Sequence, residues 1–142
     1  MSITAANAVL MLTIPPLFSI PQQLQGFAAD DVYDIPTIKS VETMMGVDGV
    51  LSGGFVYTEV KQAITLQADS PSNAVFDTWW TQMQAAQDVY VASGLIRLVT
   101  LRTKFTQLTG FLTGYKPAPA AKKVLQPRQY EITWGRIVPS PT

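Results

Sequence analysis

The acidic side chains are the first candidates for chemistry, because the chain contains neither cysteine nor histidine. This absence excludes thiolate nucleophiles, histidine general bases and the usual zinc sites. Asp30, Asp31 and Asp34 lie close together, and carboxylates suit hard cations, but their spacing lacks the glycine and the terminal glutamate of a calcium loop. We therefore expect no metal ion and no cofactor.

Paired carboxylates that cleave glycosidic bonds are a second possibility. The glutamates are Glu42, Glu59 and Glu131, and the last two fall on the polar faces of predicted strands. The glycine-rich run GVDGVLSGG is followed by a strand pattern instead of a helix, so it does not match a phosphate-binding loop. We predict that the protein is not an enzyme and that it has no catalytic residues.

Charge is divided along the chain. Residues 1–96 carry two basic and nine acidic groups, a net charge of −7, and residues 97–142 carry eight basic groups and one acid, a net charge of +7. One interpretation is that the fold interleaves the two halves and pairs their charges within one subunit. The other is that complementary faces meet between copies, as head-to-tail assembly requires.

The second interpretation points to charged residues near predicted loops as inter-subunit contacts. Its candidates are four acids facing four bases: Asp30, Asp31, Asp34, Asp48, Lys116, Lys122, Lys123 and Arg128. The four basic residues could also bind along a nucleic-acid backbone. The chain as a whole is neutral with a pI near 6.1, however, which argues against specific nucleic-acid binding.

Composition indicates a folded chain whose surface is poor in charge. Only 14% of the residues are charged and 47% are apolar, whereas about a quarter of a soluble domain is usually charged. The deficit favours surface that other subunits cover, although a monomer rich in Gln, Thr and Ser would also fit. We expect one domain over residues 1–142, made in the cytoplasm, with no secretory signal and no membrane insertion.

Strand patterns fill the first half of the chain. Residues 8–14 and 17–27 read as strands, and a short strand around 38–44 leads into a flexible loop. The glycine-rich loop as a whole spans about 34–54. Residues 56–67 give the clearest alternation of apolar and polar side chains, which is typical of a half-buried antiparallel strand.

A long amphipathic helix is predicted from about residue 71 to residue 92. Ser70 suits the N-cap, Pro71 suits the first helical position, and Gly94 suits the left-handed position after the last turn. Aromatic and apolar side chains recur at helical spacing, and with one residue of the last strand they form the expected core: Phe76, Trp79, Trp80, Met83, Tyr90 and Trp134.

Strands also fill the second half. Residues 94–102 and 103–115 read as a hairpin, 116–123 as a loop and 124–138 as a closing strand. The predicted fold class is α+β and mainly β: an antiparallel sandwich or barrel that carries one long amphipathic helix.

Two segments resemble tail tube-type structural proteins of tailed phages. They are ITLQADSPSNAVFDTWWTQMQAAQDVYVASG and GFLTGYKPAPAAKKVLQPRQYEITWGRI, and they cover close to half of the chain. The resemblance lies in the order of the elements: a strand, a helix capped at SPSN, a hairpin and a closing strand. These proteins are related in architecture to the tube proteins of type VI secretion.

The resemblance implies a virion structural protein that self-assembles into stacked, hexameric rings. Such rings form the inner tube of a contractile tail, contact sheath and baseplate proteins, and conduct DNA without specific binding. In such families a long loop in the first half of the chain reaches a neighbouring ring, and residues 34–54 match it in position. Two alternatives stay open: a tube-initiating ring at the baseplate, and a small monomeric barrel that binds a ligand or peptide, with Trp79, Trp80 and Trp134 lining its pocket.

Overall fold

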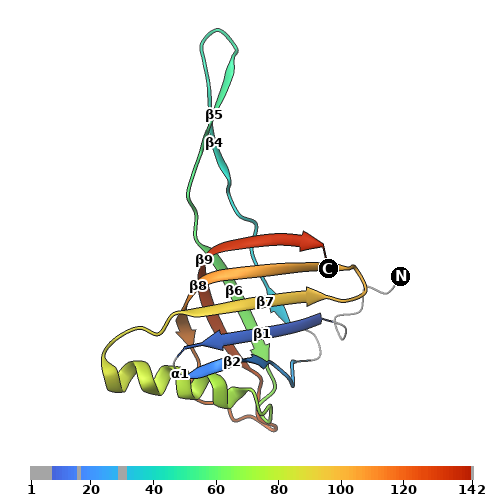
Figure 1. The fold of residues 1–142 in the computed structure, drawn as a ribbon, viewed down its shortest axis with the longest axis vertical. Coiled ribbons are helices and arrows are strands. Elements are labelled where there is room, and N and C mark those ends of the chain that lie inside the picture. The colour runs from blue at the N-terminus through green and yellow to red at the C-terminus, as the bar shows by residue number, and fades with distance from the viewer. Residues whose placement is uncertain (1–7, 16, 29–31, 142) are drawn as a thin grey trace.

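A computed structural model describes residues 8–15, 17–28 and 32–141 as a folded antiparallel sheet with one helix and one projecting hairpin (Figure 1). The seven-stranded sheet has the order β2-β1-β7-β8-β9-β6-β3, and β4 pairs with β5 in the separate hairpin. In chain order the strands are β1 Ala8–Ile14, β2 Phe18–Gln23, β3 Tyr33–Asp34, β4 Val41–Met45, β5 Leu51–Phe55, β6 Val60–Leu66, β7 Ala92–Leu98, β8 Thr103–Tyr115 and β9 Arg128–Pro141.

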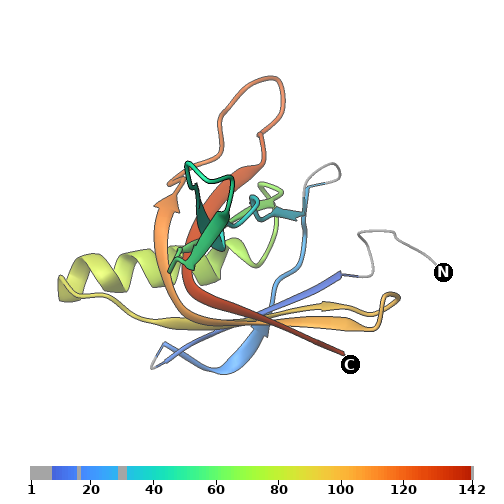
Figure 2. The same ribbon diagram turned by 90° about the horizontal axis from the view of Figure 1, so that it is seen from above.

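Two long strands fold the sheet over into two layers. The first half of β8 pairs with β7 and with the end of β9, whereas the start of β9 pairs with β6. Seen from above, both strands curve through a wide bend (Figure 2). One layer is therefore β2-β1-β7-β8-β9, and the other contains the remaining halves of β8 and β9 with β6 and β3.

The indole of Trp134 occupies the bend. A Cβ atom on Gly110 would lie 2.4 Å from the Trp134 ring, and one on Gly94 would lie 2.8 Å from it. Thr109, beside Gly110, has a positive φ of 56°, which marks the irregular backbone at this point. The bend therefore depends on two positions without side chains, because the ring fills the space that those side chains would take.

The core lies between the layers and is built from alternating strand positions. Tyr130, Ile132 and Trp134 of β9 point inward and are fully buried, as the alternation in the sequence predicts. The cluster of buried apolar side chains is Leu10, Leu12, Ile14, Leu24, Val60, Ile64, Leu66, Phe76, Trp79, Ala92, Ile96, Tyr130, Ile132 and Trp134. Met83 and Tyr90 pack against this cluster and are partly buried.

The helix α1 spans Asn73–Ala86, so the predicted range of 71–92 was too long at both ends. The N-cap position is Ser72 in place of Ser70, although the Ser70 hydroxyl still accepts a bond from the Ser72 N–H at 3.2 Å. The helix ends because Gln87 adopts a left-handed conformation. Gly94 lies in β7, where its lack of a side chain admits Trp134.

Trp80 was wrongly assigned to the core. Its side chain is 37% exposed, whereas Phe76 and Trp79 are fully buried. A helix of this length buries one face only, and Trp79 already occupies it, donating its indole N–H to the Tyr90 carbonyl oxygen at 3.0 Å. Trp80 instead stacks on Tyr115 at the edge of the core, with ring centroids 4.9 Å apart.

Residues 41–55 form a hairpin, where a strand at 38–44 followed by a flexible loop was predicted. The predicted strand at 38–44 corresponds to β4, but a second strand, β5, pairs with it in register from Val41 opposite Phe55 to Met45 opposite Leu51. The turn between them is closed by a bond from the Gly49 N–H to the Gly46 carbonyl oxygen, and Gly49 has a φ of 84°. Asp-Gly between apolar runs is a hairpin signal that the sequence did contain.

The predicted fold class is confirmed as mainly β with antiparallel pairing and one helix, and the sheet is not a closed barrel. Strand β1 has its predicted bounds. Strand β2 is shorter than the predicted 17–27, and β6 starts at Val60 instead of residue 56, because the preceding residues belong to the base of the hairpin.

The two neighbouring tryptophans give a matched stability test. Trp79→Ala is expected to lower the free energy of unfolding by about 3 to 5 kcal/mol, because it empties a fully buried site. Trp80→Ala is expected to cost less, about 2 kcal/mol, because this ring is 37% exposed and its removal loses partial burial and one aromatic pair. Urea unfolding of both variants measures the difference, and equal losses would contradict the burial pattern.

Candidate assembly surfaces

The hairpin of β4 and β5 is the largest projecting feature of the described chain (Figure 1). It extends away from the sheet on the side of β9, and all of its residues are exposed. Large apolar side chains are prominent among them: Val41, Met44, Met45, Val47, Val50, Leu51 and Phe55. Because an isolated two-stranded hairpin is at best marginally stable in water, such a segment is suited to packing against another protein.

Two strand edges in the first layer lie without a neighbouring strand among the described residues. Strand β2 pairs only with β1, and the part of β9 beyond Trp134 pairs only with β8, because β6 begins at Val60, opposite Trp134. These edges lie at opposite ends of the same layer. Both carry proline, at Pro21 and at Pro139 and Pro141, which is tolerated at edges and limits the donors available for pairing.

The connection between β8 and β9 forms a basic surface at the end of the molecule opposite the hairpin (Figure 1). Lys116, Lys122 and Lys123 are exposed there beside a shallow groove. Val124 and Leu125 also border this groove, and both are more than half exposed. This basic groove therefore combines positive charge with apolar contact area.

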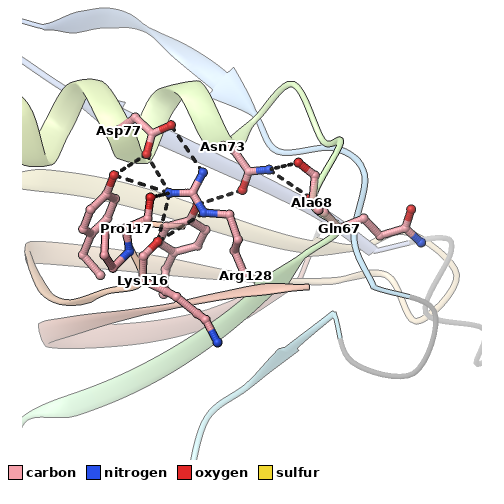
Figure 3. A network of polar contacts seen from close by, with 9 residues as sticks. Gln67, Ala68, Asn73, Asp77, Lys116, Pro117 and Arg128 are labelled. Carbon is pink, nitrogen blue, oxygen red and sulfur yellow. Dashed lines mark hydrogen bonds and ion pairs between the residues drawn. The ribbon is translucent and has the colours of Figure 1, made fainter. Parts of the chain in front are cut away.

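Arg128 does not belong to that surface, and its assignment as an inter-subunit contact was wrong. Its side chain is only 7% exposed and pairs with Asp77 of α1 at 2.7 Å (Figure 3). The guanidinium also donates to the backbone carbonyl oxygens of Lys116 and Pro117. Tyr115 and Tyr130 flank it at 5.7 and 5.3 Å from their ring centroids. With its charge satisfied inside the subunit, Arg128 holds α1 to the sheet.

Asn73 extends this network to the start of the helix (Figure 3), through a hydrogen bond with Tyr130. The Tyr130 hydroxyl donates to Asn73 Oδ1 at 2.7 Å, and the Asn73 amide donates to the carbonyl oxygens of Gln67 and Ala68. Phe76 stacks on Tyr130 with centroids 4.1 Å apart. The helix is thus fixed by packing and by directional polar contacts together.

The network shifts the ionisation of its members. Burial of Asp77 opposes its ionisation, but hydrogen bonds from Arg128 and Tyr115 outweigh this effect and hold the pKa of Asp77 below its usual value. The bond to Asp77 raises the pKa of Arg128, and burial raises the pKa of Tyr130. All three groups therefore keep their neutral-pH charge states in the folded chain.

The remaining predicted contact residues are dispersed. Asp30 and Asp31 lie outside the described residues. Asp34 is exposed in the edge strand β3, and Asp48 is exposed at the hairpin turn, where its Oδ1 accepts the Val50 N–H at 3.1 Å. Within the described ranges, the ion pairs are Lys39 with Glu42, Lys61 with Glu59, and Arg128 with Asp77. Asp48 forms no ion pair within these ranges, and its predicted pairing with lysines of another copy stays a prediction.

Residues 8–15, 17–28 and 32–141 contain no group of three acidic, histidine or cysteine side chains placed to hold a metal ion. In the same part of the chain, the helix is too short and too polar to cross a bilayer.

The sequence matches a family of phage tail proteins. The match is to the family described as tail fiber protein gp32, and it covers residues 1–138. The chain belongs to this family. No curated protein matches the sequence of this gp32-family member.

The fold of this gp32-family chain is shared with components of contractile injection systems. The anti-feeding prophage tube-terminating cap superposes with a TM-score of 0.65 at 12% identity, covering 100% of this chain and 93% of that one. The PVC sheath/tube terminator gives 0.63 at 10% identity over 99% and 97%. The PVC sheath-tube complex gives 0.56 at 12% identity over 94% and 88%. The resemblance to tail tube-type proteins is thereby confirmed at the level of the fold, and the family match adds a tail protein family.

The ion pair between Asp77 and Arg128 predicts a specific pH dependence. Because the pKa of Asp77 is lowered in the folded state, its stabilisation is present above its unfolded pKa of about 3.9 and is lost as the pH falls toward the folded value. Asp77→Asn should be less stable than the wild type at neutral pH, and the difference should shrink below about pH 4. Urea unfolding across this range measures it.

Asp69→Asn is the matched control for this experiment, because Asp69 is an exposed acid that takes part in none of the ion pairs above. It should follow the wild type throughout. A constant gap between Asp77→Asn and the wild type at every pH would show that the ion pair does not contribute.

Proposed function

We propose that this protein is a non-enzymatic structural subunit of a phage tail, which assembles into rings that form part of the tail tube. Membership of the gp32 family and the fold shared with tube, cap and terminator proteins support a structural role in a tail. The ring, its hexameric size and its contacts with sheath and baseplate proteins are the finer part of this proposal. In this view the protein is located in the virion.

The observation that carries the proposal is the pair of open edges on one layer. A surface that ends in β2 on one side and in β9 residues 135–141 on the other allows each copy to join the next edge to edge. Contacts of this kind are heterologous, and they close into a ring when the rotation between copies closes. An exposed edge that would otherwise favour aggregation becomes an interface.

The hairpin supports contact with a further region of a neighbouring copy. It projects at one end of the molecule, whereas the β8–β9 connection lies at the other end (Figure 1), and residues of that connection line the basic groove. Asp48 at the turn is opposite in charge to Lys116, Lys122 and Lys123, and the apolar hairpin residues match Val124 and Leu125. We propose that copies arranged head to tail bring these two surfaces together.

A ring that closes the end of the tube is a second candidate. The cap and the terminator superpose with TM-scores of 0.65 and 0.63, above the 0.56 of the sheath-tube complex. A subunit of the tube wall extends into long tubes, whereas an end ring stops after one layer. Negative-stain images of the purified protein at high concentration distinguish these two outcomes, and a monomer at every concentration, with no rings, would contradict both.

The edge at β2 can be tested by substitution. Ile20 is an exposed apolar residue of β2, and Ile20→Lys places a charge on the proposed joining edge. We expect the variant to melt like the wild type but to elute as a monomer in size-exclusion chromatography with light scattering. Val89→Lys, which changes an exposed valine away from the edges, should still form rings. Rings of unchanged abundance for Ile20→Lys would rule out this edge.

The contact between hairpin and groove can be tested by cross-linking, because the natural chain has no cysteine. Val47→Cys together with Val124→Cys places thiols on the hairpin turn and at the groove, both on exposed residues. Oxidation should then give a ladder of covalent oligomers. Val47→Cys with Val89→Cys is the control and should remain mostly monomeric. Equal cross-linking in both variants would refute a specific contact.

A further inference from the structure

The outward face of the first layer carries positive charge and no acid. The strand segments that form this layer are β1, β2, β7, residues 103–110 of β8 and residues 134–141 of β9, and none of them contains Asp or Glu. On β7 and β8, Ile96 and Gln107 are buried, so Arg97 and Lys104 at alternate positions point away from the core. Arg136 of β9 is also exposed, opposite Leu108.

The register places these bases side by side. Arg97 lies directly opposite Lys104 on the neighbouring strand, and the same row continues from Val9 on one side to Ser140 on the other. Like charges directly opposite each other destabilise a sheet. None of the three bases takes part in an ion pair within the described residues. The face therefore has an uncompensated positive charge that an anionic partner would neutralise.

The position of this face in the assembly follows from the edges. The same layer ends in the two open edges, so copies joined at those edges form a continuous wall with the bases on one side. The second layer, α1 and the β8–β9 connection lie on its other side (Figure 2). The bulkier side needs the larger circumference, so the basic face lines the channel of a closed ring. This step rests on the proposed ring.

We propose that this basic face binds the phosphate backbone of duplex DNA in the channel. Arg97, Lys104 and Arg136 recur once per copy around a ring, which spaces positive charge around the duplex. The remaining outward side chains of the layer are neutral and include Thr13, Ser93, Thr106 and Ser140. Such a surface attracts phosphate without reading base sequence, and its affinity falls steeply with salt.

The experiment measures binding of a short, fluorescently labelled DNA duplex by anisotropy at several salt concentrations. The double variant Arg97→Gln with Lys104→Gln should bind about tenfold or more weakly at low salt, and its affinity should depend less steeply on salt. The matched control is Lys39→Gln with Lys61→Gln, which removes the same charge from two exposed lysines outside this face and outside the basic groove. The control should bind DNA like the wild type.

Light scattering on the same samples reports ring formation separately. If the wild type forms no rings, the proposed function fails, whereas DNA binding that depends on Arg97 and Lys104 would still support this face. Equal weakening in both double variants would overturn the proposal, because binding would then reflect net charge alone. Binding of poly-glutamate without binding of DNA would also overturn it, in favour of an acidic protein partner. Should the double variant fail to fold, Arg136→Gln alone provides the same comparison.

Discussion

The need to bury Trp134 within the bend of β8 and β9 constrains the rest of the structure. Gly94 and Gly110 leave room for the ring, and the indole N–H donates to Gln62 Oε1 at 3.0 Å. Gln107 donates to the same oxygen at 2.9 Å, so two donors fix the orientation of the Gln62 amide and leave its Nε2 without a partner in the described residues. Such an unsatisfied buried group costs about 1 to 3 kcal/mol, which the burial of a large aromatic ring can offset.

The bend also determines which surfaces remain open. Because β8 and β9 each serve two layers, β6 can pair only with the start of β9, and the remainder of β9 becomes an edge. The opposite edge is β2, and the face between them carries the basic side chains. The division of charge along the sequence thus has three structural outcomes: one partly buried ion pair across the halves, one basic groove and one basic sheet face.

The sequence predicted the type and order of the helix and strands better than the residues at which they begin and end. Alternation in 56–67 and 124–138 identified strands because one face of each is buried, and the absence of His and Cys excluded whole classes of chemistry. The end of the helix was predicted too late because the apolar spacing continues to Tyr90. Tyr90 lies beyond the helix, and its backbone carbonyl oxygen accepts the Trp79 indole N–H. Trp80 and Arg128 were misplaced because residue type alone predicts a buried tryptophan and an exposed arginine. The packing of α1 against Tyr115 and Tyr130 instead leaves Trp80 partly exposed and buries Arg128. The basic sheet face could not be predicted, since it requires the register that sets Arg97 opposite Lys104.

The hairpin of β4 and β5 has no hydrophobic core of its own. Its strands bury no side chain, so its hydrogen bonds and turn must offset the conformational entropy of ordering it without help from a core. A partner that covers Met44, Val47 and Leu51 would supply the missing apolar burial, and it would do so only in the assembled state. In the proposed assembly, burial of the hairpin on a neighbouring copy would couple its ordering to assembly, and the subunit would gain stability as each neighbour is added.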